Sequence, residues 1–68
     1  MTREQITLVI KKREDLLEQN PNLRKGQAFY LMLSTYFYHK AMEITATKFD
    51  PFYEDKKIPK CINYLLNH

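Results

Sequence analysis

One pair of side chains has a spacing that metal binding or acid–base catalysis can use. His39 and Glu43 are four residues apart, so on a helix they would share one face. A metal site or a catalytic pair also needs a third ligand and a cleft, and the sequence around them indicates neither. Polar pairs at this spacing are common on helix surfaces, so we predict no catalytic or metal-binding role for them.

The clustered carboxylates and the single cysteine do not complete a reactive site either. Asp50, Glu54 and Asp55 lack the alternating spacing and the glycine of a calcium-binding loop, and capping of a turn explains them more simply. Cys61 has no nearby histidine to activate it, which predicts a semi-buried structural thiol. A glycine-rich phosphate loop is absent. We therefore expect a protein that is not an enzyme and uses no cofactor and no metal ion.

Length and composition indicate one small domain. The 68 residues are near the lower limit for folding on a hydrophobic core alone, and 44% of them are hydrophobic, as in ordinary globular chains. A single cysteine excludes an internal disulfide, which favours a reducing compartment. No apolar segment is long enough to span a membrane, and the first residues predict a helix instead of a signal peptide. We expect a cytoplasmic protein without membrane contact.

The charge pattern permits binding to nucleic acid without requiring it. The chain has 11 basic and 8 acidic residues, a formal net charge of +3, and the surplus lies between residues 21 and 68. Together with Tyr53, several basic residues could form a surface suited to phosphates and unstacked bases. These are Arg24 and Lys25 at a helix start and Lys56, Lys57 and Lys60 beside the last helix. A small basic helical nucleic-acid-binding protein is therefore our second hypothesis.

Capping and breaking signals predict the first helix. Thr2 and Gln5 form a capping-box pattern, and Pro21 restrains the residue before it from helical geometry. These signals predict a helix from about Arg3 to Gln19. Its apolar stripe consists of Ile6, Val9, Ile10, Leu16 and Leu17.

The next segment predicts a helix that other elements surround. Asn22 is a suitable N-cap for a helix that begins at Leu23, and this helix is apolar on most of its circumference. Gly26, the only glycine, costs roughly 1 kcal/mol relative to alanine inside a helix. We therefore expect it to permit a close backbone approach. Residues 38–47 either extend this helix or form a separate helix after a bend near Tyr38.

The end of the sequence predicts one more helix. It starts at Ile58 with Pro59 in its first turn, and its apolar face consists of Ile58, Ile62, Leu65 and Leu66. The predicted fold is all-α: a compact single domain of three to four helices with a central apolar helix.

Two motifs resemble a known group of proteins. The segments LRKGQAFYLML (residues 23–33) and DPFYEDKKIP (residues 50–59) are similar to paired L-R-x-G-Q and D-P-F-Y-x-D motifs. These motifs occur in small, uncharacterised bacterial and bacteriophage proteins. Relatives often carry a proline where this chain has Tyr38, which implies a helix break there. The group offers no established catalytic residues, so the resemblance implies an origin and not a mechanism.

If the two motifs occur together because they touch, the DPFY segment packs on the helix near Gly26 and Gln27. We expect Gln27 to satisfy backbone groups in the irregular turn. Asp50 should cap a helical turn that Pro51 begins. The rings of Phe49 and Phe52 should be buried against the central helix, and Tyr53 should stay near the surface.

The favoured functional hypothesis is a docking protein. The central segment has more tyrosine and methionine than a small bundle can bury, and leftover apolar area marks sites for partners or self-association. We expect a small phage-type protein that docks on a larger host or phage protein in the host cytoplasm and modulates or inhibits it. The candidate partner-binding residues are Tyr53, Arg24, Lys25, Lys56, Lys57 and Tyr38.

Overall fold

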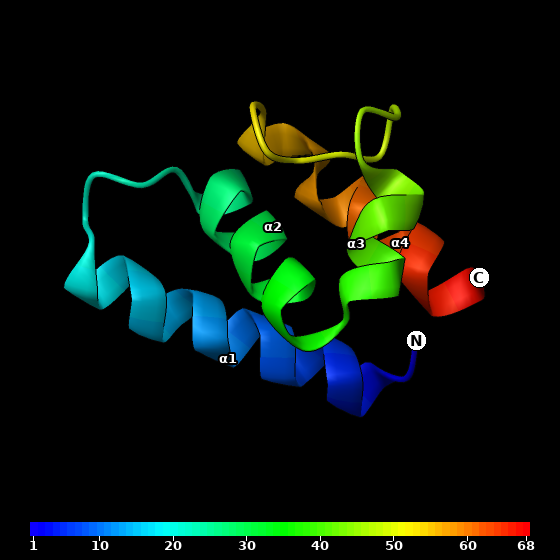
Figure 1. Ribbon diagram of the computed structural model, residues 1–68, viewed down its shortest axis with the longest axis horizontal. Coiled ribbons are helices and arrows are strands. Elements are labelled where there is room, and N and C mark those ends of the chain that lie inside the picture. The colour runs from blue at the N-terminus through cyan, green and yellow to red at the C-terminus, as the bar shows by residue number, and fades with distance from the viewer.

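Four α-helices and one short 3₁₀ helix follow one another in the computed structural model, which describes residues 1–68 (Figure 1). In chain order they are α1 (Arg3–Gln19), α2 (Lys25–Tyr36), α3 (Tyr38–Ile44), the 3₁₀ helix η1 (Asp55–Lys57) and α4 (Ile58–Asn67). No strand is present, so the predicted all-α single domain is confirmed, with four helices. None of the helices combines the length and apolar character that crossing a membrane requires.

Helix α1 has the predicted bounds because its capping box forms. The backbone N–H of Thr2 donates to Oε1 of Gln5 (2.9 Å), and the N–H of Gln5 donates to Oγ1 of Thr2 (3.1 Å). In the predicted apolar stripe, only Ile6 and Val9 are buried. The leucines of the C-terminal half stay partly exposed, because that half of α1 extends past the other helices at the edge of the bundle (Figure 1).

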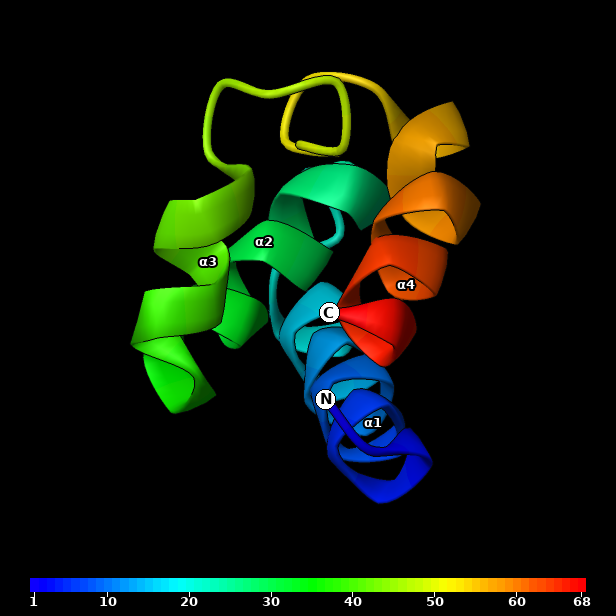
Figure 2. The same ribbon diagram turned by 90° about the vertical axis from the view of Figure 1, so that its right-hand side faces the viewer.

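Helix α2 is the central element, as predicted. It lies between α3 and α4, with α1 crossing below all three (Figure 2). Phe29 and Leu33, one helical turn apart on α2, have no exposed surface. They belong to one buried cluster with side chains from the other three helices, which are Ile6, Val9, Ala41, Ile44, Cys61 and Leu65. Burial of each large apolar side chain stabilises the fold by about 1.5–3 kcal/mol.

The predicted start of α2 is wrong by two residues. Asn22 does not cap the helix, because residues 20–23 form a turn in which the N–H of Leu23 donates to the carbonyl of Asn20 (3.1 Å). The N-cap residue is Arg24, whose own side chain makes no capping hydrogen bond. A carboxylate from a distant part of the chain satisfies the first turn instead, as the next section describes.

The choice left open for residues 38–47 is resolved in favour of a separate helix. Phe37 has φ −140° and ψ 64°, which is outside helical geometry, so α2 ends before it and α3 begins after it. Its N–H still donates to the carbonyl of Leu33 (2.7 Å), and its carbonyl accepts from Ala41 (3.1 Å). Phe37 therefore joins the two helices without a proline at the break.

Helix α4 begins at Ile58 with Pro59 in its first turn, as predicted. Its buried side chains, however, are Cys61 and Leu65. Cys61 is fully buried and not semi-buried, because the face of α4 that meets the core is centred on it. Leu66 is rotated about 100° from Leu65 around the helix and is 37% exposed.

Candidate binding surface

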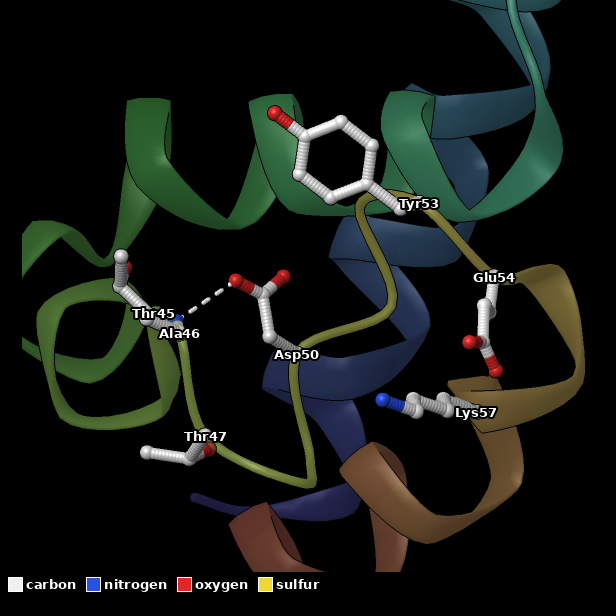
Figure 3. A pocket seen from close by; sticks show the side chains of 7 residues that line it. All are labelled: Thr45, Ala46, Thr47, Asp50, Tyr53, Glu54 and Lys57. Atoms are coloured by element: carbon white, nitrogen blue, oxygen red, sulfur yellow. Dashed lines mark hydrogen bonds between the residues drawn. The ribbon is translucent and has the colours of Figure 1, made fainter.

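The segment that joins α3 to η1, residues 45–54, is an irregular loop held together by one carboxylate. We call it the Tyr53 loop. Oδ2 of Asp50 accepts the N–H of Ala46 (2.8 Å, Figure 3), and Oδ1 accepts the N–H of Phe52 (3.0 Å). Asp50 thus caps the turn, as predicted. The turn is not a helical one: the N–H of Glu54 donates to the carbonyl of Pro51 (3.2 Å) in a single tight turn.

Gly26 allows the Tyr53 loop to touch the first turn of α2. Pro51 is fully buried, and its carbonyl oxygen lies so close to Gly26 that a Cβ atom there would collide with it. The N–H of Gly26 donates to Oδ1 of Asp55 in η1 (2.8 Å). The predicted close backbone approach at Gly26 and the predicted contact between the two motifs are both confirmed.

Gln27 has a different role from the predicted one. Its Oε1 accepts the N–H of Arg24 at 3.5 Å, within its own helix, and makes no hydrogen bond to the Tyr53 loop. A glutamine at the third position of a helix reaches back to the cap residue, which points it away from the loop. The groups that fasten the loop are Asp55 and Arg24, and Nη2 of Arg24 donates to the carbonyl of Phe52 (3.0 Å).

The two phenylalanines of the loop pack on different helices. Phe52 meets Tyr30 of α2 edge to face, with the ring centroids 5.5 Å apart. Phe49 instead stacks on Tyr64 of α4 at 4.6 Å. Both phenylalanines are only half-buried. The prediction of rings buried against the central helix is therefore wrong for Phe49, which packs on α4, and is confirmed for Phe52 only in its contact with α2. Pro51, which lies between them, is the residue of the loop that is fully buried.

Tyr53 is the most exposed large hydrophobic residue, with 79% of its surface accessible. This confirms that it lies at the surface. Its ring stands between two open hollows and lines both of them. The larger hollow, of about 500 Å³, lies between Tyr53 and Lys57 (Figure 3). Its lining residues are Thr45, Ala46, Thr47, Asp50, Tyr53, Glu54 and Lys57.

Arg24 fixes the base of this surface. Its guanidinium carbon lies 5.9 Å from the ring centroids of both Phe52 and Tyr53, within the range of a cation–π contact. The hydroxyl of Tyr30 and Oγ1 of Thr45, 2.7 Å apart, share a hydrogen bond that ties the start of the loop to α2. The Tyr53 loop is therefore attached to α2 at several points.

The formal net charge of the whole protein is concentrated at this end. Residues 24–25 and 48–60 contain six of the 11 basic and three of the 8 acidic residues, whereas the remaining five of each sign balance. Among the six basic residues, only Lys56 forms an ion pair, with Glu54 (3.7 Å). The carboxylates of Asp50 and Asp55 accept backbone N–H groups instead. We call the six basic residues, which are Arg24, Lys25, Lys48, Lys56, Lys57 and Lys60, the basic ring.

Five of the six predicted partner-binding residues lie at this end, and Tyr38 does not. It begins α3, whereas the Tyr53 loop follows the last residue of that helix. Tyr38 is 58% exposed and meets His39 edge to face, and Met42, one turn later, is 43% exposed. The sequence did not predict Thr45 and Thr47 as part of this surface, because hydroxyl residues that follow a helix give no sign that they will line a hollow.

Of the residues considered for catalysis or metal binding, Asp50 and Glu54 line the larger hollow, whereas His39, Glu43 and Cys61 line neither hollow. The structure contains no group of three or more side chains that could hold a metal ion. Glu43 pairs with Lys40 (3.5 Å) on α3. Burial, with a contribution from the Asp50 carboxylate, raises the pKa of the Cys61 thiol to about 12. The thiol therefore stays protonated near neutral pH, where it is a poor nucleophile. Comparisons with protein-family models, curated proteins and solved structures found no match to this chain.

Proposed function

We propose that this protein is a non-enzymatic binding module that docks on a larger protein through the Tyr53 loop. The observation that carries the proposal is the exposure of Tyr53, 79% on a loop that is itself well attached. Tyrosine is among the residues that dominate binding energy at protein interfaces. An exposed ring of this kind supplies a large contact area once a partner covers it.

The attachment of the loop makes this surface suitable for binding. Asp50 and Arg24 hold the loop backbone through hydrogen bonds of 2.8–3.0 Å, and Asp55, directly after the loop, accepts the N–H of Gly26 in α2 (2.8 Å). A surface that is already ordered loses little conformational entropy when a partner binds, so more of the contact energy appears as affinity. Hydroxyl and carboxylate groups around the hollow add the polar rim that such interfaces have.

The same surface gives little support to catalysis. Both carboxylate oxygens of Asp50 accept backbone N–H groups, and the buried thiol of Cys61 is held in its neutral form. The hollow has no histidine to act as a base. We therefore retain the proposal of a non-enzymatic protein that uses no cofactor.

The resemblance to bacterial and bacteriophage proteins adds an origin to this proposal. The two motifs that carry it, residues 23–33 and 50–59, lie against each other through Gly26 and Pro51. A phage protein with such a surface would act in the host cytoplasm. There it would modulate or inhibit the host or phage protein on which it docks.

Nucleic-acid binding is the second candidate, and the concentration of net charge in the basic ring favours it. Two carboxylates argue against it, because Asp50 and Glu54 line the hollow beside Tyr53 and would repel a phosphate backbone that followed the ring. We rank it below protein docking for this reason.

The test is capture from a bacterial lysate on the immobilised protein, with and without nuclease. Tyr53→Ala removes the exposed ring, and Tyr38→Ala is the matched control at the opposite end of α3. We expect a nuclease-resistant protein that is captured by wild type and by Tyr38→Ala and is lost with Tyr53→Ala. Equal capture by Tyr53→Ala would refute the proposal, and loss of capture after nuclease treatment would favour the nucleic-acid alternative.

A further inference from the structure

We infer that the partner of the Tyr53 loop presents an acidic protein segment, whose carboxylates pair with the basic ring while Tyr53 provides the apolar anchor. This inference rests on the proposed docking function and specifies the chemistry of the partner.

The surplus of positive charge lies entirely within residues 24–25 and 48–60, and the rest of the chain is neutral overall. The second of these segments contains Tyr53, and Arg24 of the first lies against the Tyr53 ring. Helix α2 begins at Lys25 and α4 begins at Ile58, so both helices start at this end (Figure 1). A helix N-terminus carries about half a positive charge, which adds to the same field.

The lysines of the basic ring are available to a partner. Lys25 and Lys60 are exposed and form no ion pair, and Lys56, whose side chain is 85% exposed, forms only a long one. Figure 3 shows the Lys57 side chain lying along the hollow below Tyr53, and no ion pair neutralises it within the protein. Complementary charges of this kind accelerate encounter and select partners of the opposite sign.

Two carboxylates beside the basic ring favour a protein segment over nucleic acid. The ring is interrupted by Glu54, whose side chain is 44% exposed, and by Asp50 in the hollow. A phosphate backbone repeats its charge at every nucleotide and would meet these carboxylates. A protein segment can place its acidic residues opposite the lysines. Its own N–H or hydroxyl donors can then face Asp50, Glu54 and the oxygens of Thr45 and Thr47.

The protein's own acidic residues make a second copy the main rival occupant. The second half of α1 carries three acidic residues, which are Glu14, Asp15 and Glu18, and no basic residue follows them before Arg24. Arg13 already binds Glu14 at 2.7 Å. Fewer carboxylates of α1 are therefore free to attract the basic ring of a second copy. Self-association is therefore one of the outcomes that the experiment must separate.

The experiment measures binding of the full chain to three probes. The first is a pool of short peptides randomised over Asp, Glu, Leu, Phe and Gly. The second is the same pool with Asn and Gln in place of the acids, and the third is an oligothymidylate. We compare wild type with Lys56→Gln/Lys60→Gln. The matched control, Arg3→Gln/Lys11→Gln, removes two exposed charges on α1. Sedimentation of the free proteins reports self-association.

We expect the acidic pool to bind and the amide pool to bind at least about tenfold more weakly. The variant Lys56→Gln/Lys60→Gln should lose about three- to tenfold in affinity for the acidic pool, as expected for two exposed ion pairs. The α1 control should match wild type. Affinity should fall as salt is raised.

Three results would overturn the inference. They are equal or absent binding of both peptide pools, tighter binding of oligothymidylate than of the acidic pool, and salt-sensitive self-association that the ring variant abolishes. Lysate capture separates this inference from the proposed function. If capture depends on Tyr53 and not on Lys56 and Lys60, docking stands and the acidic partner is wrong. If capture does not depend on Tyr53, the docking proposal itself fails.

Discussion

The middle of helix α2 is buried among apolar side chains, whereas polar contacts hold its first turn. Phe29 and Leu33 are fully enclosed by side chains of the other three helices. The first turn, in which Gly26 and Ala28 are also buried, is covered by a different part of the chain. It is held by the carboxylate of Asp55, by the guanidinium of Arg24 and by the close passage of the Pro51 carbonyl over Gly26.

The difference explains why the candidate binding surface is where it is. Apolar packing stabilises the fold in proportion to the apolar area that it removes from water, and it brings no polar groups to the surface for a partner to bind. The polar contacts stabilise less, but they fix the backbone of the Tyr53 loop and leave the ring of Tyr53 exposed. The middle of α2 therefore maintains the fold, and its first turn positions the surface that we propose binds a partner.

The largest loss of stability should come from a change in the apolar middle of α2. Phe29→Ala removes a fully buried ring, and such truncations lower the free energy of unfolding by about 3–5 kcal/mol. A domain of this size has about that much stability in total. We expect loss of the cooperative thermal transition followed by circular dichroism. A variant with near-wild-type stability would mean that the core does not depend on α2.

A smaller change in stability should come from the polar first turn of α2, and its sign tests the close approach at Gly26. At a free helical position, alanine in place of glycine stabilises by up to about 1 kcal/mol. At Gly26 the added Cβ meets the Pro51 carbonyl, so Gly26→Ala should destabilise by about 1–3 kcal/mol. Urea denaturation measures the change, with Lys25→Ala, at the exposed neighbouring position, as the control. Stabilisation of Gly26→Ala would contradict the close approach.

The thiol of Cys61, which belongs to the apolar core, predicts that stability depends on alkaline pH. The pKa of Cys61 is about 12 in the folded protein and 9.0 without the influence of the fold. Above pH 9 the unfolded chain releases this proton first, so stability falls as pH rises, by up to about 1.4 kcal/mol per pH unit. Lysines and tyrosines also titrate in this range. The measurement is therefore the difference in slope between wild type and Cys61→Ala from pH 8 to about 11. Equal slopes would show that the thiol is not shielded.

The smallest effect should follow loss of the distant cap. Asp55→Ala leaves the N–H of Gly26 without its acceptor, and loss of a helix cap costs about 1 kcal/mol. Asp55→Asn keeps an oxygen acceptor and should lose less. Hydrogen exchange at Gly26 reports the bond directly, and it should accelerate far more in the alanine variant. Unchanged exchange in both variants would mean that the bond does not hold the turn.

Local signals made much of the fold predictable from the sequence. The capping box of Thr2 and Gln5 and the proline in the first turn of α4 each lie within a few residues of the boundary that they set. The start of α2 was mispredicted because its cap comes from Asp55, and nothing near residue 24 in the sequence indicates a partner so far away. Phe49 was misplaced because the turn at Asp50 sends the residues on either side of it toward different helices.

Local signals also made part of the candidate site predictable. The exposure of Tyr53 and the close approach at Gly26 follow from the geometry of one turn and from the cost of a glycine inside a helix. The hollow does not, because its lining residues come from the start, the middle and the end of the Tyr53 loop and from Lys57 of η1. Only the folded loop brings these residues together.

The bond between Gly26 and Asp55 also has a consequence for the order of folding. These two residues are 29 positions apart, and closing a chain segment of that length costs roughly 3 kcal/mol of entropy. Contacts of this range form after local helices, and weakly held segments open before the core does. We expect the polar attachment of the Tyr53 loop to α2 to form after the local helices. A newly synthesised chain would then acquire its helices before it acquires the ability to bind.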